Sequence, residues 1–279
     1  MKQTMKDKPK ATLFVSTFNM PRHLSLVCAG IERQNTKDFE VIICDDGSGE
    51  ETSRVVEDFR SCAAMQVDHV WQQHEGFRKC KILNEGLRRA KGEICIFLDG
   101  DCIPHRDFVK DHIDMHEPGK YLAGRRVELG PDISSRLTAE KVRNGFFDWP
   151  RLPLIISALR SDSEFLNRTI RITSPWLRSI LKLQHVADMK GCNYSVTRSA
   201  LEAINGFDET YEGYGREDTD IEIRLQNLGF SIKSMKGVAL QFHVWHPRRV
   251  FTAANDARLE ELKLSKRTRC LKGLHQAET

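Results

Sequence analysis

The stretch Ile94-Cys95-Ile96-Phe97-Leu98-Asp99-Gly100-Asp101 is an apolar run that ends in two acids separated by one glycine. Its length and composition predict a buried β-strand. Residues i and i+2 of an extended segment point the same way, so the carboxylates of Asp99 and Asp101 are expected to project together from the strand end. Neighbouring carboxylates repel each other and lose hydration there, and a divalent cation removes both penalties. The same pattern occurs in surface turns, so the metal-site hypothesis depends on the rest of the chain.

Before this point, strand-like runs alternate with amphipathic helical stretches. Strands are expected at 11–17, 39–44, 67–71 and 94–99, and helices from about Pro21, from about Glu51 and over about 77–90. This β-α-β-α order predicts right-handed crossovers and a mostly parallel sheet, flanked by helices, of the α/β class. Ligands bind such sheets at the carboxyl ends of the strands.

Polar residues stand at three of these strand ends. They are Thr17-Phe18-Asn19, Asp45-Asp46-Gly47-Ser48 and Asp99-Gly100-Asp101. Asp and Gly also favour turns, but three polar strand ends that converge on one edge indicate a binding site. No Gly-x-Gly-x-x-Gly follows the first strand, which argues against a dinucleotide fold of the NAD type.

The composition agrees with one large α/β domain or two small ones. The chain has 279 residues, 40% of them hydrophobic, and a net charge of +4. No run reaches the roughly 18 apolar residues of a membrane span, and the polar start of the chain lacks the apolar core of a signal peptide. The eight cysteines show no Cys-x-x-Cys spacing, so we expect reduced, mostly buried thiols and a cytoplasmic location.

The ordered motifs carry a family resemblance. The three strand ends, with Gly76-Phe77-Arg78 leading to Asn84, resemble the nucleotide-sugar-binding half of family-two glycosyltransferases, which have the GT-A (Rossmann-like) fold. A second set resembles the C-terminal module of β-1,4-galactosyltransferases, polypeptide N-acetylgalactosaminyltransferases and chondroitin-polymerase domains. Its motifs are Gly191-Cys192-Asn193-Tyr194-Ser195, Asn205-Gly206-Phe207-Asp208-Glu209, Gly213-Tyr214-Gly215-Arg216-Glu217-Asp218 and His243-Val244-Trp245-His246.

The resemblance covers about residues 11–126 and 186–250 and implies an organisation of the chain. It places the nucleotide-sugar-binding half at 1–126, a helical insertion at 127–185, the acceptor-binding and metal-completing half of the same domain at 186–250, and a basic C-terminal helix or tail at 251–279.

The resemblance also implies a metal site. Asp101 would bind the cation that bridges the donor diphosphate, while Asp99 and Gly100 would lie near the ribose. His243 and His246 stand where galactosyltransferases have a Met-x-x-His pair that completes the metal shell. Imidazole is a stronger ligand than a thioether for a hard or borderline cation, so we expect Mn²⁺, with Mg²⁺ second.

Other donor contacts follow from the same resemblance. The nucleobase, normally uracil, would meet Asp45 or Asp46, a choice that the sequence leaves open. The remaining candidates are Thr17 and Asn19 beside the nucleotide, Arg78 near a phosphate, Asn84, and one of Arg125 and Arg126. Leu83 stands where many family members have Arg before the matching Asn84, which puts that usual contact in doubt. The other cations of 77–90 are interpreted mostly as a solvated face.

The acceptor side depends on Gly213 to Asp218. Glycines allow close approach of a sugar, and Tyr214 offers a stacking face. Acids are common in first helical turns, but in the matching family motif the aspartate is the base. Asp218 therefore takes that role, and Glu217 would hold an acceptor hydroxyl. One in-line displacement would invert the anomeric carbon.

The sequence thus predicts a metal-dependent inverting glycosyltransferase. It would move a hexose or N-acetylhexosamine from a UDP-sugar to a saccharide or lipid-linked acceptor in cell-surface polysaccharide synthesis. A sugar-1-phosphate nucleotidyltransferase is an alternative, but no glycine-rich loop with a lysine follows the first strand. A non-catalytic carbohydrate-binding or assembly subunit would need the acids and ligands to be missing. Basic residues are too scattered for a nucleic-acid binder.

Two basic, amphipathic segments leave their role open. Residues 131–185 are either a helical hairpin packed on the sheet edge or a surface that sits on anionic lipid. Residues 259–274 would dock on the protein body or on a bilayer. Peripheral membrane association is therefore a hypothesis for both segments.

Overall fold

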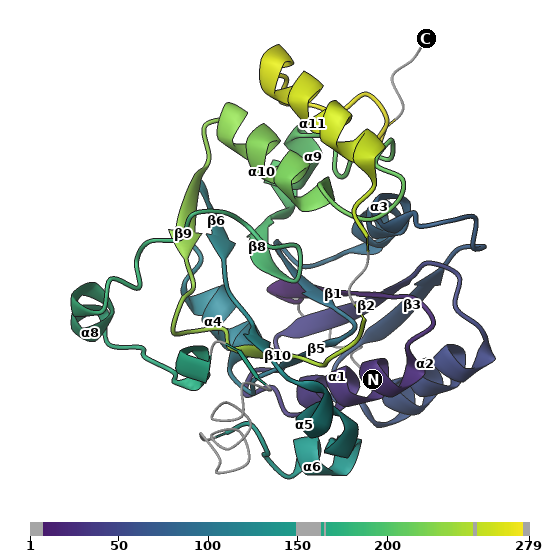
Figure 1. Ribbon diagram of the computed structural model, residues 1–279, viewed down its shortest axis with the longest axis vertical. Helices are drawn as coiled ribbons and strands as arrows, with labels where there is room; N and C mark the ends of the chain where they lie inside the picture. The colour runs from purple at the N-terminus through teal and green to yellow at the C-terminus, as the bar shows by residue number, and fades with distance from the viewer. Residues whose placement is uncertain (1–7, 149–162, 165, 248–249, 276–279) are drawn as a thin grey trace, which may run out of the picture.

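The computed structural model describes residues 8–148, 163–164, 166–247 and 250–275. A seven-stranded sheet with the order β3-β2-β1-β4-β8-β6-β9 forms the centre, and a three-stranded sheet with the order β5-β10-β7 accompanies it. Helices cover both faces of the large sheet (Figure 1).

The first half of the chain alternates strands and helices as predicted. The strands are β1 (Ala11–Thr17), β2 (Phe39–Asp45), β3 (Val67–Trp71) and β4 (Ile94–Asp99), and the helices are α1 (Pro21–Glu32), α2 (Glu50–Cys62) and α3 (Lys79–Arg89). β1 pairs in parallel with both β2 and β4, and β2 pairs in parallel with β3. The predicted α/β class and mostly parallel sheet are confirmed.

The second half extends the sheet with one antiparallel strand. β8 (Asn193–Thr197) runs antiparallel between β4 and β6 (Lys120–Ala123), and β9 (Ser231–Ser234) lies parallel beside β6. The helices of this half are α4 (Phe108–Asp114), α5 (Pro131–Arg136), α6 (Ala139–Arg143), η1 (Leu166–Thr169), α8 (Pro175–Ile180), α9 (Arg198–Ala203), α10 (Glu217–Asn227) and α11 (Ala253–Ser265).

The large sheet separates two hydrophobic cores, because successive strand residues point to opposite faces. In β1, Leu13 and Val15 pack with α1 and α2 on one face, whereas Phe14 packs with α3, α9 and α10 on the other. Figure 1 shows these two groups of helices on opposite sides of the sheet. Burial on both faces explains why β1, β2 and β4 are continuous apolar runs.

The small sheet joins distant parts of the chain at the edge where β4 ends. Its strands are β5 (Cys102–Pro104), β7 (Val127–Glu128) and β10 (Gln241–His243). β10 pairs antiparallel with β5 and parallel with β7, so His243 lies opposite both Cys102 and Glu128. The backbone N–H of Val244 also donates to the Asp101 carbonyl at 2.8 Å. This pairing brings His243 beside Asp101.

The two segments of open role are only partly described. Residues 127–185 contain β7, α5, α6, η1 and α8, while 149–162, which hold Trp149, the mostly apolar run 152–159 and two of the arginines of this segment, lie outside the described residues. In the C-terminal segment the helix begins earlier than expected, at Ala253, and ends at Ser265. Among the described helices, none combines the length and the apolar character that a membrane span requires.

Candidate functional site

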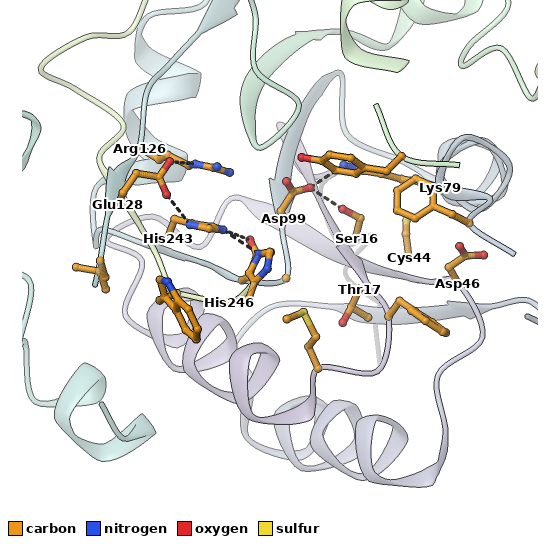
Figure 2. A pocket seen from close by; sticks show the side chains of 18 of the residues that line it. Ser16, Thr17, Cys44, Asp46, Lys79, Asp99, Arg126, Glu128, His243 and His246 are labelled. Carbon is orange, nitrogen blue, oxygen red and sulfur yellow. Dashed lines mark hydrogen bonds and ion pairs between the residues drawn. The ribbon is translucent and has the colours of Figure 1, made fainter. Parts of the chain in front are cut away.

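A pocket of about 600 Å³ lies at the carboxyl ends of β1, β2 and β4. The three polar strand ends contribute Thr17, Asp46 and 99–101 to its lining, as their common edge predicts. Figure 2 shows Arg126, Glu128, His243 and His246 along one side, with Asp99, Lys79 and Ser16 across from them. Aromatic side chains complete the lining: Phe18, Phe77, Tyr214, Trp245 and Phe251.

Three potential metal ligands meet in this pocket. Nε2 of His246 lies 3.2 Å from Oδ2 of Asp101, and Nε2 of His243 lies 3.7 Å from Oδ1 of Asp101. The two Nε2 atoms are 3.2 Å apart. Ligand atoms of all three residues lie within 4.8 Å of one another. The register of the small sheet therefore assembles an Asp-His-His cluster from two distant parts of the chain.

The hydrogen bonds of both imidazoles suit metal binding. Nδ1 of His243 lies 2.6 Å from Oε2 of Glu128, and Nδ1 of His246 lies 2.8 Å from the Pro247 carbonyl. Both partners are acceptors, so each Nδ1 carries the proton and each Nε2 of a neutral ring presents a lone pair. Two lone pairs that face each other beside a carboxylate are repulsive alone and form a ligand set around a cation.

Two ionised carboxylates, Asp101 and Glu128, also support the Asp-His-His cluster as a metal site. Burial would raise the pKa of Asp101, but without a metal the imidazoles of His246 and His243, in their protonated form, hold that pKa well below its usual range. Burial likewise opposes ionisation of Glu128, whereas His243 and Arg126 lower the pKa of Glu128 to about 2. Nε of Arg126 donates to Oε1 of Glu128 at 2.6 Å. Both carboxylates are thus ionised at neutral pH, one facing the cluster and one behind it.

Gly100 lets the acidic strand end lie directly against β1. A Cβ on Gly100 would come within 2.8 Å of the Ser16 carbonyl and 3.2 Å of Oγ1 of Thr17, closer than carbon atoms tolerate. The buried Oγ1 of Thr17 has no hydrogen-bond partner among the described residues, although Thr17 lines the pocket. This hydroxyl is available to a bound molecule.

The structure distinguishes the two acids at the end of β2. Asp46 lines the pocket, and its carboxylate accepts hydrogen bonds from the Arg78 backbone N–H at 2.8 Å and from Gln72 at 2.5 Å. Asp45 is fully buried, accepts from Ser48 at 2.8 Å and lies 3.0 Å from Nε2 of a histidine on β3. Of the two, only Asp46 reaches the pocket.

Three other candidates lie outside the pocket lining. The Asn19 side-chain oxygen accepts a backbone N–H of the loop after β2, which joins two loops. Arg78 donates to Glu75 at 2.5 Å. The fully buried Asn84 amide exchanges two hydrogen bonds of 2.9 Å with the Phe207 backbone. In the described structure their hydrogen bonds join neighbouring segments, and their side chains do not face the pocket.

Lys79 is a pocket residue that sequence reasoning assigned to a solvated face. Its Nζ lies 2.7 Å from Oδ1 of Asp99 and 3.7 Å from Oε1 of Glu217. Burial would lower the pKa of Lys79, but these two acids raise it above its usual value. Lys79 precedes Leu83 by four residues, so both share a helix face. That spacing was the available signal, because Leu83 stands where related chains have an arginine.

Glu217 and Asp218 begin α10 behind this lysine. Neither lines the pocket, and Lys79 connects Glu217 to it. Oδ2 of Asp218 accepts the Gly191 backbone N–H at 3.0 Å. Burial raises the pKa of Glu217, Asp218 adds to that rise, and Lys79 opposes it. Tyr214, which lines the pocket, precedes these acids in the same loop.

The two consecutive arginines after β6, Arg125 and Arg126, point to different surroundings. Arg126 lines the pocket, whereas the guanidinium of Arg125 pairs with Asp188 at 2.5 Å and is absent from the lining. The sequence left this choice open, and of the two arginines only Arg126 lines the pocket.

Comparison with known proteins identifies the family of this chain. The family model described as "Glycosyl transferase family 2" matches residues 12–182, and the model described as "N-terminal domain of galactosyltransferase" matches residues 182–247. The chain is 25% identical to chondroitin synthase of Escherichia coli over 256 residues, which cover 83% of this chain and 34% of that protein. It therefore spans about a third of that relative.

Solved structures share the fold. A mannosyltransferase from Pyrobaculum calidifontis, in complex with GDP-Man and Mn²⁺, has a TM-score of 0.60 and 17% identity and covers 94% of this chain and 64% of its own. Staphylococcus aureus TarS in complex with UDP has a TM-score of 0.59 and 19% identity over 92% of this chain and 65% of its own. The predicted GT-A fold is confirmed, and the chain belongs to glycosyl transferase family 2.

Proposed function

We propose that this protein is a metal-dependent inverting glycosyltransferase that uses a UDP-sugar. It would transfer a hexose or N-acetylhexosamine to a saccharide or lipid-linked acceptor in polysaccharide synthesis. The observation that carries the proposal is the Asp101-His243-His246 cluster inside a pocket of about 600 Å³. UDP bound to TarS and the relationship to chondroitin synthase support the donor and the process.

The cation would be held by Asp101, His243 and His246. When bound, it would stabilise the negative charge that grows on the departing diphosphate. Two imidazoles beside one carboxylate favour a borderline cation such as Mn²⁺ over Mg²⁺, which prefers oxygen ligands. The Mn²⁺ in the structurally similar mannosyltransferase agrees with this choice.

The donor would lie along the ends of β1, β2 and β4. Asp46 would accept a hydrogen bond from the uracil N–H, and the unpaired hydroxyl of Thr17 would contact the nucleoside. Asp99, which Ser16 holds through a hydrogen bond of 2.9 Å, would lie at the ribose. Arg126 would contact the diphosphate, because a guanidinium matches phosphate oxygens.

The acceptor would approach from the loop that precedes α10. Asp218 would remove the acceptor proton as the acceptor oxygen attacks the anomeric carbon and UDP departs, and this single displacement gives inversion. Glu217 would orient the acceptor hydroxyl. Lys79 would keep Glu217 ionised and hold it at a defined distance from Asp99, so it acts as a positioning residue between donor and acceptor.

The two alternatives receive less support. The family match extends over both halves of the chain, which argues against a nucleotidyltransferase. The potential ligands and acids are all present and are buried or partly buried, which argues against a non-catalytic subunit.

A donor screen tests the proposal. Incubation with UDP-, GDP-, ADP- and TDP-sugars, with Mn²⁺ or with a chelator, should release nucleoside diphosphate from UDP-sugars only, and only with Mn²⁺. Hydrolysis by water suffices for detection, so no acceptor is needed. Release that is equal with Mn²⁺ and with chelator, or faster from ADP-sugars than from UDP-sugars, would argue against it.

A further inference from the structure

Exposed apolar side chains concentrate on one short helix outside the pocket. Five residues on and around α8 have exposed fractions between 41% and 69%. They are Ile170, Trp176, Leu177, Ile180 and Leu181. We call this set the α8 patch. Isolated exposed apolar residues are ordinary, but a cluster that contains a Trp marks an interaction surface.

The fold holds the α8 patch outward. Trp176 and Ile180, like Leu177 and Leu181, are four residues apart and share a face of the helix. The polar side chain is the buried one: Arg178 is only 5% exposed and donates to the backbone carbonyls of Ser234 and Lys236. A surface helix normally buries its apolar face, so this orientation is the reverse of the usual one. Figure 1 shows α8 standing away from the two sheets.

The charge around the patch indicates an anionic partner. The span 166–187 has four basic residues, Arg168, Arg171, Arg178 and Lys182, and no Asp or Glu. Of these, Lys182 is exposed and directly follows Leu181. Arg171 pairs with Asp111, and Arg178 is bound to the backbone carbonyls. An exposed Lys at the end of a helix that carries exposed Trp and aliphatic side chains is typical of segments that lie in a bilayer interface.

We propose that the α8 patch docks this protein on an anionic membrane surface. Five partly exposed side chains offer on the order of a few hundred Å², well below the roughly 800 Å² per partner of a stable protein interface. A bilayer needs no matching surface, and Trp and Lys suit the level of the lipid headgroups. Because a single small patch binds lipid weakly, docking is expected to be reversible and sensitive to salt.

Vesicle flotation tests this inference without any nucleotide, so its outcome does not depend on the proposed transferase activity. The full chain should float with vesicles of phosphatidylcholine and phosphatidylglycerol, and much less with phosphatidylcholine alone. The double variant Trp176→Ser, Ile180→Ser should lower the partition coefficient roughly tenfold or more, and Lys182→Glu should weaken binding to anionic vesicles only. The matched control is Trp71→Ser, Leu228→Ser, which changes one Trp and one aliphatic side chain, 52% and 38% exposed, outside both segments of open role.

Three results would overturn the inference. They are no flotation of the parent on anionic vesicles at low salt, equal flotation of the parent and the double variant, or self-association of the parent that the double variant abolishes. The last result would make the patch an interface between copies of this chain. Unchanged thermal unfolding and unchanged UDP–Mn²⁺ binding of the variants would show that any loss of flotation comes from the patch.

Discussion

At the scale of single residues, the site depends on how hydrogen bonds set the two imidazoles. Glu128 accepts the proton of His243 Nδ1 at 2.6 Å and is itself bound by Arg126. The lone pair of His243 Nε2 therefore faces Asp101 and His246 before any ion arrives. Such outer partners contribute to metal affinity although they do not touch the metal.

Glu128→Ala should weaken Mn²⁺ binding by about 10- to 100-fold, because His243 loses the acceptor that orients its ring. Glu128→Gln should lose less, since an amide oxygen still accepts from Nδ1. Titration of Mn²⁺ followed by calorimetry measures both affinities, with Glu140→Gln, an exposed acid on α6, as the control. Equal Mn²⁺ affinity of Glu128→Ala and the parent would remove Glu128 from the site.

Asp218→Asn separates chemistry from binding. It preserves the shape of the side chain and one of its two backbone hydrogen bonds, accepted from the Gly191 N–H, but cannot take the acceptor proton. Turnover should fall by roughly 10² to 10⁴ while UDP–Mn²⁺ affinity stays near that of the parent. Glu217→Gln should raise KM for the acceptor and change the slow donor hydrolysis less. Sugar transfer by Asp218→Asn at the parental rate would place the base elsewhere.

Lys79→Met should shift the pH dependence of transfer. Lys79 lowers the pKa of Glu217 against burial, so its removal raises that pKa further. If Glu217 acts ionised, activity is lost as pH falls through its pKa, so the acidic limb of the pH profile should move to higher pH. Lys79→Arg should restore the limb, and Lys81→Met, an exposed neighbour on α3, should not move it. If the acidic limb of the pH–activity profile of Lys79→Met matches that of the parent, Lys79 does not position Glu217.

At the scale of elements, long apolar strands were predictable and short strands were not. β1, β2, β3 and β4 follow their predicted ranges within one residue. Burial on both faces makes β1, β2 and β4 mostly apolar runs, whereas the edge strand β3 keeps only Val67 and Val70 buried. β7 has two residues and β10 has three, too few for any period to show. Their pairing positions His243, so the sequence indicated the metal cluster only through the family resemblance.

The same limit applies to side-chain direction. Sequence spacing placed Asp45, Asp46, Arg78 and Lys79 near the right strand ends, but it did not say which of them face the pocket. That outcome depends on the turns after β2 and before α3. The structure directs Asp46 and Lys79 inward and engages Asp45 and Arg78 in the surrounding loops.

The two hydrogen bonds between the Asn84 amide and the Phe207 backbone join α3 to the loop after α9, and they give a prediction at this scale. Asn84→Ala leaves the buried Phe207 N–H and carbonyl without their partner, which should lower the free energy of unfolding by about 2 kcal/mol or more. Urea denaturation measures this change, with the exposed Asn227→Ala as the control. If Asn84→Ala instead keeps the parental stability and loses UDP affinity, Asn84 binds the nucleotide-sugar and does not act by joining α3 to the loop after α9.

At the scale of the whole molecule, the two sheets bring residues from both halves of the chain to one pocket. The first half supplies the polar strand ends, and the second half returns with β10, which adds the imidazoles, and with α10, whose Glu217 is linked to the pocket through Lys79. Neither half contains a complete set of residues for the proposed reaction. This division follows the two family models, which meet at residue 182.

The central claim is that a cation held by Asp101, His243 and His246 is required to bind UDP. Calorimetric titration of UDP into the parent should show tight binding with Mn²⁺ and little without it. Asp101→Asn and His246→Ala should weaken the Mn²⁺-dependent affinity by roughly 100-fold or more, because a direct ligand contributes more than the outer partners do. Asp58→Asn, an exposed acid on α2, should match the parent. Parental UDP affinity in both site variants, or UDP binding that ignores Mn²⁺, would contradict the account.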